Sequence, residues 1–337
     1  MKRILSFFIA VLFFSTAFSQ EDVKSLQATA RSFMSQGDFN NAIIVLTRAL
    51  QQDKNNLELQ KDLVSSYYYK RDYEKALDGV KALLDRNDAD VVCYQLAGNV
   101  YKALEQVKDC ERVYKSGLKK FPKSGSLYSE YGELLWAKKD YSAIDTWEKG
   151  IQEDPAYSGN YYNAALFYYY TKDKVWSLVY GEIFVNMESL TERAAAMKQL
   201  LLDGYKQKLF TDPDMLKDLS LHKSEFSKAF LQCMSKESSL GNRGITTEAL
   251  TMIRTRFILE WFDKYAAKFP YRLFDYQRQL IQEGMFDAYN QWLFGAVENL
   301  ASYDNWNKTH NDQYTSFATF QRSRIFKMPQ GQYYQVK

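Results

Sequence analysis

The sequence has few of the residues that interrupt helices. Its 337 residues include only 15 glycines and 5 prolines. These two residue types mark most turns, so their scarcity argues against a fold built from many short strands. It favours long helices with short connections, and no segment shows a convincing strand pattern.

Histidine is scarcer still, which limits the chemistry that the chain can carry out. The two histidines, His222 and His310, lie far apart and have no ligand-like neighbours, so no metal centre is predicted. The sequence contains no local signature of a Ser–His or Cys–His pair and no phosphate-binding loop with its lysine. We therefore expect no cofactor and no enzymatic activity, and we assign no catalytic residue.

The three cysteines, Cys93, Cys110 and Cys233, do not suggest a disulfide framework. The pattern places Cys93 and Cys110 at opposite ends of an antiparallel helix pair. At 1.5 Å per residue they are about 12 Å apart along the helices, beyond the roughly 7 Å between Cα atoms that a disulfide allows. We predict three buried thiols, although a partner for Cys233 through tertiary contact remains open.

Charge of either sign is not in excess. Lysine plus arginine minus acidic residues gives 44 − 41 = +3, which is too balanced to indicate a nucleic-acid partner. Apolar residues make up 46% of the chain and aromatic residues 16%, which is enough for a packed core.

The N-terminus has the three parts of a secretory signal peptide, which we assign to residues 1–19. Lys2 and Arg3 precede an apolar run from Ile4 to Phe14, and Ala17-Phe18-Ser19 is a small-residue cleavage site. The alternative is an uncleaved anchor. No cysteine for a lipid anchor lies near the cleavage site, and no later run reaches about 18 apolar residues. We expect a soluble mature protein, periplasmic or secreted, that begins near Gln20.

Residues 23–190 contain about five copies of a unit of about 34 residues. The clearest copy, Val91 to Ser124, carries Tyr94, Ala97, Gly98, Tyr101, Cys110, Tyr114, Gly117 and Pro122. The copies close at Lys54, Asp88, Pro122 and Pro155, and the fourth is one residue short. This pattern resembles the tetratricopeptide repeat, in which small residues let two helices touch and aromatic residues fill the gaps. An ordinary helical bundle with chance periodicity is the alternative.

The resemblance implies an all-α fold, an α-solenoid of about five helix–turn–helix repeats that forms a right-handed superhelix. An aromatic-rich helical domain over residues 191–337 follows it, with a degenerate repeat-like hairpin around Gly284. In the family the first helix of each repeat lines a concave groove that binds peptides or protein segments. The residues at these positions are Tyr68, Tyr69, Asn99, Lys102, Glu133, Trp136, Tyr162, Tyr169 and Tyr170. Lys61 is followed by Ser65, a departure from the family's carboxylate-clamp pattern.

Residues 191–337 are expected to contain several helices. Ser189-Leu190-Thr191-Glu192 resembles a capping box that opens the first of them, which should cover the end of the repeats. Aromatic residues are densest between positions 261 and 294, and a helical core explains them more simply than a binding site does. Four arginines lie in or near this stretch, Arg254, Arg256, Arg272 and Arg278, and they either contact an anion or extend from the helix surface into water.

These features predict an exported adaptor that binds a protein or peptide segment of a cell-envelope partner in its groove. The alternative is an envelope enzyme or a protein that binds glycans or peptidoglycan through the aromatic C-terminal region. A third possibility is that this region folds into the groove and covers its aromatic residues.

Overall fold

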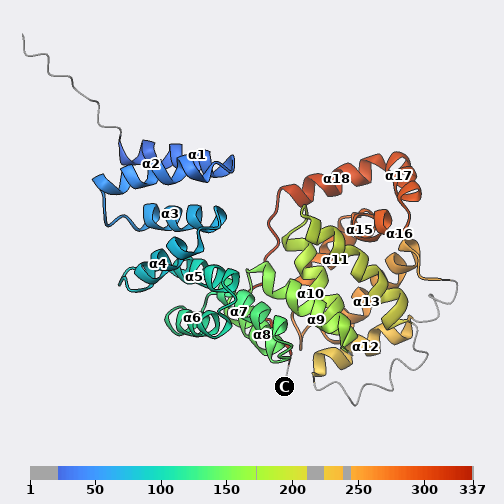
Figure 1. Cartoon of the computed structure of the whole chain (residues 1–337). Coiled ribbons are helices and arrows are strands. Elements are labelled where there is room, and N and C mark those ends of the chain that lie inside the picture. Colours follow the sequence, from blue (N-terminus) through green and yellow to red (C-terminus); the bar gives the residue numbers. More distant parts are fainter. Residues whose placement is uncertain (1–21, 172, 211–223, 238–243, 336–337) are drawn as a thin grey trace, which may run out of the picture. The chain divides into compact units, whose positions relative to one another are not determined.

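A computed structural model describes residues 22–171, 173–210, 224–237 and 244–335 (Figure 1). The regular elements of the described residues are all helices, which confirms the predicted all-α fold. The predicted signal peptide, His222 and most of the loop that contains Gly241 lie outside the described residues. The chain divides into two compact units, one ending at Gln106 and the other beginning at Val107.

The first unit consists of consecutive helices that match the predicted repeats. They are α1 (Val23–Ser35), α2 (Phe39–Gln52), α3 (Leu57–Tyr69), α4 (Tyr73–Leu84) and α5 (Val91–Ala103). The side chains of Asp38, Asn56, Asp72 and Asp90 each accept a backbone hydrogen bond at the start of a helix. Such caps satisfy amide groups that have no partner inside the helix. The repeats are therefore delimited by short-range signals.

The turn inside each repeat has the same geometry at intervals of 34 residues. Gly37, Arg71, Glu105 and Lys139 have positive φ angles of 76°, 66°, 56° and 61°. The next backbone amide in each case donates to the carbonyl five residues earlier, and all four bonds measure 2.9 Å. This is the Schellman arrangement that ends a helix with a left-handed residue. Because the fourth repeat is one residue short, the fifth equivalent residue is Lys172, which lies outside the described residues. Asp173 caps the helix that follows it with a φ of −84°, as Asp38 and Asp72 cap α2 and α4 with φ angles of −86° and −84°.

The second unit begins with the next repeats and continues into the C-terminal region. Its repeat helices are α6 (Val107–Lys120), α7 (Gly125–Ala137), α8 (Ala143–Glu153), α9 (Ser158–Tyr170) and α10 (Lys174–Met187). In the fourth repeat, which is one residue short, Asp140 accepts a hydrogen bond from the amide of Ser142, and α8 begins only at Ala143. Gly132 of α7 lies so close to Trp147 of α8 that a Cβ there would be 2.3 Å from the indole nitrogen.

Further helices follow α10 in the chain. They are α11 (Glu192–Asp203), the π-helical η1 (Gly204–Leu209), α12 (Glu225–Lys236), α13 (Thr247–Lys264), α14 (Arg272–Gln282), α15 (Phe286–Asn290), the π-helical η4 (Gln291–Gly295), α16 (Ala296–Glu298), α17 (Leu300–Thr309) and α18 (Asn311–Arg322). Every residue of α10 from Val175 to Val185 is buried. The helix that closes the repeats is therefore also the central helix of the C-terminal core.

The predicted cover of α10 is present, since α11 and η1 together span 192–209, but Ser189 of the predicted capping box is not its N-cap. Gly181 of α10 packs against Met197 and Leu201 of α11, as expected for a helix that covers the end of the repeats. The residue that caps α11 is Thr191, whose hydroxyl accepts from the amide of Ala194. Ser189 was the predicted cap. The cover also extends beyond α11, because Trp176 of α10 stacks on Phe226 of α12.

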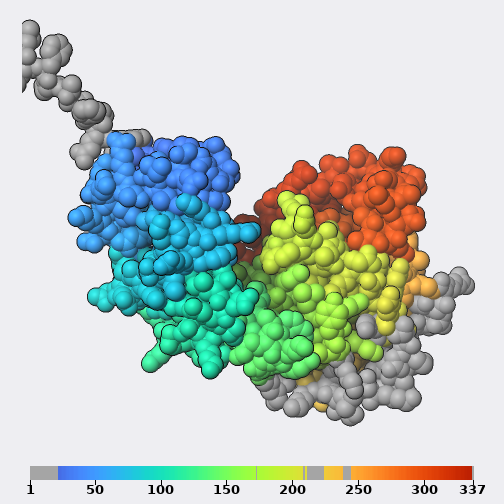
Figure 2. All heavy atoms as spheres, in the orientation of Figure 1, coloured from blue at the N-terminus to red at the C-terminus, as the bar shows by residue number. Residues whose placement is uncertain are grey.

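The C-terminal residues return to helices of the fourth and fifth repeats. The hairpin of α17 and α18 lies on the surface of the second unit, in red in Figure 2. After it, an extended segment places Phe326 and Met328 in the core. Its Tyr333 donates to Glu148 of α8 at 2.9 Å, and Gln335 donates to the hydroxyl of Tyr168 of α9 at 2.7 Å.

The three cysteines are buried and none of them is part of a disulfide among the described residues, as predicted. Burial raises the pKa of Cys93 to about 11 and that of Cys233 to about 12, so both thiols stay protonated and unreactive near neutral pH. None of the described helices is both long enough and apolar enough to cross a membrane.

Candidate functional site

The predicted groove residues of the first unit lie on α3 and α5. Tyr69, which is 60% exposed, stacks on Phe39 of α2 with ring centres 5.6 Å apart. Tyr68 is half-buried and lies edge-on to Tyr69 at 5.2 Å. On α5, Asn99 is half-buried and Lys102 is exposed. This unit therefore has a pair of aromatic side chains at its surface beside two polar positions.

In the second unit, Glu133 and Trp136 lie on α7. Glu133 accepts a hydrogen bond from Asn163 of α9 at 3.0 Å, which joins the first helices of two successive repeats. Trp136 is 39% exposed, and the rest of its surface is covered, because its ring centre lies 5.3 Å from Phe167 and 5.8 Å from Tyr141. Trp136 therefore supports the packing of its repeat as well as presenting an aromatic edge to solvent.

The three tyrosines predicted on α9 differ in exposure. Tyr170 is 72% exposed, and half-buried Tyr169 meets it edge-on at 5.3 Å. Tyr162 is half-buried against Phe184 of α10 at 4.9 Å, and the guanidinium of Arg193 lies over its ring. The C-terminal segment reaches Glu148 of α8 and Tyr168 of α9 but leaves Tyr170 in solvent.

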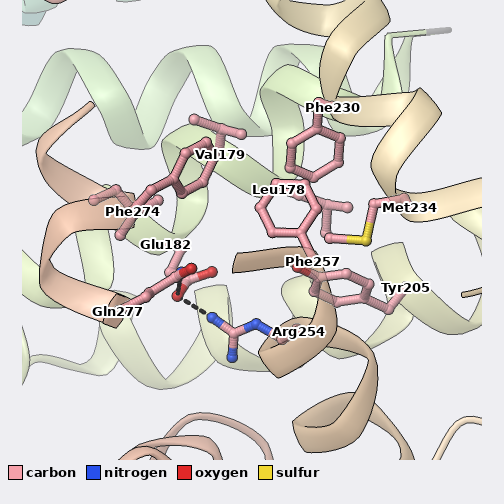
Figure 3. A pocket seen from close by; sticks show the side chains of 11 residues that line it. Leu178, Val179, Glu182, Tyr205, Phe230, Met234, Arg254, Phe257, Phe274 and Gln277 are labelled. Carbon is pink, nitrogen blue, oxygen red and sulfur yellow. Dashed lines mark hydrogen bonds and ion pairs between the residues drawn. The ribbon is translucent and has the colours of Figure 1, made fainter. Parts of the chain in front are cut away.

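A buried ion pair, not predicted from the sequence, lies at the centre of the C-terminal core (Figure 3). The carboxylate of Glu182 on α10 faces the guanidinium of Arg254 on α13, and both side chains are almost fully buried. Glu182 also accepts from Gln277 at 2.6 Å and from Tyr289 at 2.7 Å, while Arg254 donates to Asn290. The sequence contained one sign of this ion pair, since Glu182 is the single charged residue within the apolar run of α10 from Val175 to Val185.

The neighbouring cavity is too small for a ligand. It measures about 10 Å³ and is bordered by apolar side chains such as Phe230 and Phe257 together with the ion pair (Figure 3). That volume holds at most about one water molecule. Burial alone lowers the pKa of Arg254, but the charge of Glu182 and the nearby tyrosines raises it above its ordinary value. We assign this cluster a structural role, because its charges are paired and out of reach of solvent.

The four arginines named in the sequence analysis lie in different environments. Arg254 is buried, so extension from the helix surface was the wrong alternative for it. Arg256 pairs with Glu237 at 3.3 Å, and Arg278 lies 4.0 Å from Asp275. Arg272 has no carboxylate partner among the described residues and borders a large cavity in the second unit. The described residues contain no cluster of His, Cys, Asp or Glu side chains that could hold a metal ion.

The geometry of the repeats defines a class of protein, the helical repeat scaffold, in which stacked helix pairs expose their first helices. Comparison with known protein families matches residues 33–100 to the tetratricopeptide repeat. Four successive turns of identical geometry at intervals of 34 residues agree with this match. The matched part of the chain therefore consists of tetratricopeptide repeats, as the sequence predicted.

Several solved structures are similar to this chain, whereas no curated protein matches it. TTC0263, a thermophilic repeat protein of this family from Thermus thermophilus, is 14% identical with a TM-score of 0.45, over 54% of this chain and 100% of that one. A tetratricopeptide repeat protein from Parabacteroides merdae is 14% identical with a TM-score of 0.42, over 82% and 99%. YrrB, described as having an unusual peptide-binding site, is 18% identical with a TM-score of 0.37, over 54% and 94%.

Proposed function

We propose that this repeat protein is an exported adaptor that binds a protein or peptide segment of a cell-envelope partner. The observation that carries the proposal is the unequal burial of aromatic side chains along single first helices. On α9, Tyr161 and Tyr168 are buried whereas Tyr170 is 72% exposed. On α3, Tyr69 is 60% exposed. Large aromatic side chains left in solvent are typical of interaction surfaces and often contribute most of the binding energy.

The binding mode follows from the shape of such side chains. Tyrosine offers a rigid apolar face and a hydroxyl that can donate or accept, so it holds an extended or helical segment at little entropic cost. In the second unit, Glu133 and Asn163, which are joined by a hydrogen bond of 3.0 Å, offer polar groups on the same first helices as Trp136 and Tyr170. Binding, rather than catalysis, is the activity that these groups support. Export and an envelope partner rest on the predicted signal peptide.

Site-specific crosslinking in the native envelope tests this proposal. Tyr170 is replaced by the photoreactive residue p-benzoylphenylalanine, and crosslinked proteins are identified by mass spectrometry. The matched control carries the same residue at Ile44, which is 64% exposed but lies on α2, a second helix. We expect position 170, and not position 44, to capture one or a few envelope proteins. Equal capture at both positions, or none at position 170, would contradict the proposal.

A further inference from the structure

The second unit contains a ligand-sized cavity whose lining includes none of the predicted groove residues. It measures about 420 Å³ and is bordered by the end of α10, by α14, by η4 and by α18. Small-molecule sites commonly span roughly 300–1,000 Å³. Leu190 and Ile325 border the cavity and are 96% and 81% exposed, the highest values among the large apolar side chains of the described residues. Apolar side chains in water around a hollow are typical of a binding site.

The charge around this cavity is entirely positive. Arg272, Arg322 and Arg324 line it, and none of the described residues that line it is acidic. None of the three has a carboxylate partner in the described part of the chain, whereas Arg256 of the same region pairs with Glu237. Like charges around one space repel each other, and an anion placed among them would remove that repulsion. A guanidinium also matches the paired oxygens of a carboxylate or phosphate.

The remaining lining groups suit the other parts of an organic ligand. Rings of Tyr276, Trp292 and Phe326 provide apolar surface. The side-chain nitrogen of Gln321 is buried without a hydrogen-bond partner among the described residues, so the wall holds an unused donor. Trp292 belongs to η4, and π-helical segments inserted in α-helices occur frequently at functional sites.

We propose that this cavity binds a small organic anion, in which a carboxylate or phosphate group is joined to an apolar or aromatic body. Arg272 is half-buried on α14 and holds the charged group, while Arg322 and Arg324 on the exposed side attract it. Gln321 donates to an oxygen of the ligand. The aromatic rings enclose the body, which gives the site a preference for amphipathic anions over inorganic ions.

An adjoining cavity extends the site and carries a fourth cation. It measures about 300 Å³ and shares Ser189, Leu190 and Trp292 with the first cavity. Lys198 lines it, donates to the carbonyl of Trp292 at 2.9 Å and lies 3.8 Å from the centre of the indole ring. Burial lowers the pKa of Lys198 to about 8, and none of the described carboxylates pairs with it. A bound anion near Trp292 would therefore favour the charged form of this lysine.

Fluorescence titration with 8-anilinonaphthalene-1-sulfonate, an aromatic anion, tests the proposal on the full mature chain. The expected result is one bound equivalent, with affinity reduced at least tenfold by Arg272→Gln and largely retained by Arg272→Lys. Arg278→Gln is the matched control, since Arg278 lies on the same helix and outside the cavity, and should change affinity less than twofold. Thermal unfolding of each variant confirms that it is folded.

The neutral analogue N-phenyl-1-naphthylamine separates charge recognition from apolar binding. Its affinity should be the same for the wild type and Arg272→Gln, because it lacks the anionic group. Unchanged sulfonate binding by Arg272→Gln, or an equal loss for the neutral analogue, would overturn the proposal.

Competition then identifies the anionic group. Indole-3-acetate displaces the fluorescent anion if the site selects carboxylates, and phenyl phosphate displaces it if the site selects phosphates. Failure of both at millimolar concentration would contradict the proposal. None of these results depends on the groove of the repeats, so this proposal and the crosslinking test at Tyr170 are independent of each other.

Discussion

The first unit and the C-terminal part of the second unit are held together by contacts of different range. In the first unit, side chains that meet across helices are separated by about one repeat, as in the bonds of Arg31 to Asp62 and of Lys61 to Asp90. In the second, Glu182 bonds to Tyr289 across 107 residues, and Tyr333 bonds to Glu148 across 185. Local contacts repeat with the sequence, whereas distant ones do not.

The two regions each contain a lysine that is partly or fully withdrawn from water, and they surround it differently. Lys61 is buried in the first unit and pairs with Glu58 and Asp90, each at 2.6 Å. Lys198 in the second unit donates to a backbone carbonyl and pairs with no carboxylate in the described part of the chain. A repeat array thus neutralises its buried lysine with residues from the same and the next repeat. In the C-terminal region the buried Arg254 is paired with Glu182, but the cations around the two larger cavities have no carboxylate partner among the described residues, which is expected of a site that receives an anion.

The largest difference between the regions is expected from breaking one ion pair in each. Glu182→Gln leaves the buried charge of Arg254 without its partner, which should lower the free energy of unfolding by about 3–5 kcal/mol. Asp62→Asn breaks the exposed pair with Arg31 and should cost about 1 kcal/mol or less. Urea denaturation of both variants provides the measurement. Similar losses for the two variants would show that the buried cluster does not hold the C-terminal core together.

Replacing the two lysines should change stability less than breaking the buried ion pair, and the two replacements should act in opposite directions. The pKa of Lys198 is lowered from 10.5 to about 8, so between these values the unfolded chain keeps a proton that the folded chain has released. Stability should therefore rise with pH in this window, by about 1–2 kcal/mol, since one pKa unit is worth about 1.4 kcal/mol before screening. Lys198→Met should abolish the rise and stabilise the protein at neutral pH.

Lys61 is the matched comparison for this pH response. Burial lowers the pKa of Lys61, but its bonds to Asp90 and Glu58 outweigh burial and raise it above the ordinary value. The contribution of Lys61 to the free energy of unfolding is therefore complete below pH 10.5, the ordinary pKa of lysine. It is lost only as the pH rises through the raised pKa of the folded protein. Lys61→Met should destabilise the protein at neutral pH. Urea denaturation at about pH 7, 8, 9 and 10 checks both lysines. Stabilisation by Lys61→Met would contradict the expected difference between the paired Lys61 and the unpaired Lys198.

The smallest effects are expected at the regular turns of the repeats. Lys139 has a positive φ of 61°, which glycine adopts without strain, so Lys139→Gly should stabilise the protein by about 1 kcal/mol or less. Gly37→Ala, at the equivalent turn of the first repeat, should destabilise it by a similar amount. Thermal unfolding measures both variants, and shifts of the same sign would show that the two turns are not equivalent.

The repeat helices could be predicted from sequence because each is specified by nearby residues. Small residues such as Ala42, Ala76 and Cys110 recur every 34 residues, and capping side chains lie within three residues of the amides they bind. The same reasoning gave the wrong cap for α11, because only Ser189 has a glutamate three residues later, whereas the folded chain uses Thr191, which is followed by Ala194 at that position.

The C-terminal sites could not be predicted in the same way. Whether an arginine is paired depends on residues far away in the sequence, as for Arg254 and Glu182, which are 72 positions apart. The sequence could therefore name Arg272 among four candidates but could not show which of the four lacks a carboxylate partner in the described part of the chain. The nine groove residues stay predictions from family position, and the structure adds how exposed each one is.

The most direct test of the account compares two tyrosines of the same helix. Tyr161 and Tyr170 both lie on α9, but the first is 2% exposed and the second 72%. Tyr161→Ala should lower the free energy of unfolding by about 3–5 kcal/mol through the cavity it leaves. Tyr170→Ala should leave stability nearly unchanged and weaken capture of the envelope partner by about 2 kcal/mol, roughly thirtyfold in Kd. Full capture by a stable Tyr170→Ala variant would contradict a binding role for the exposed aromatic face.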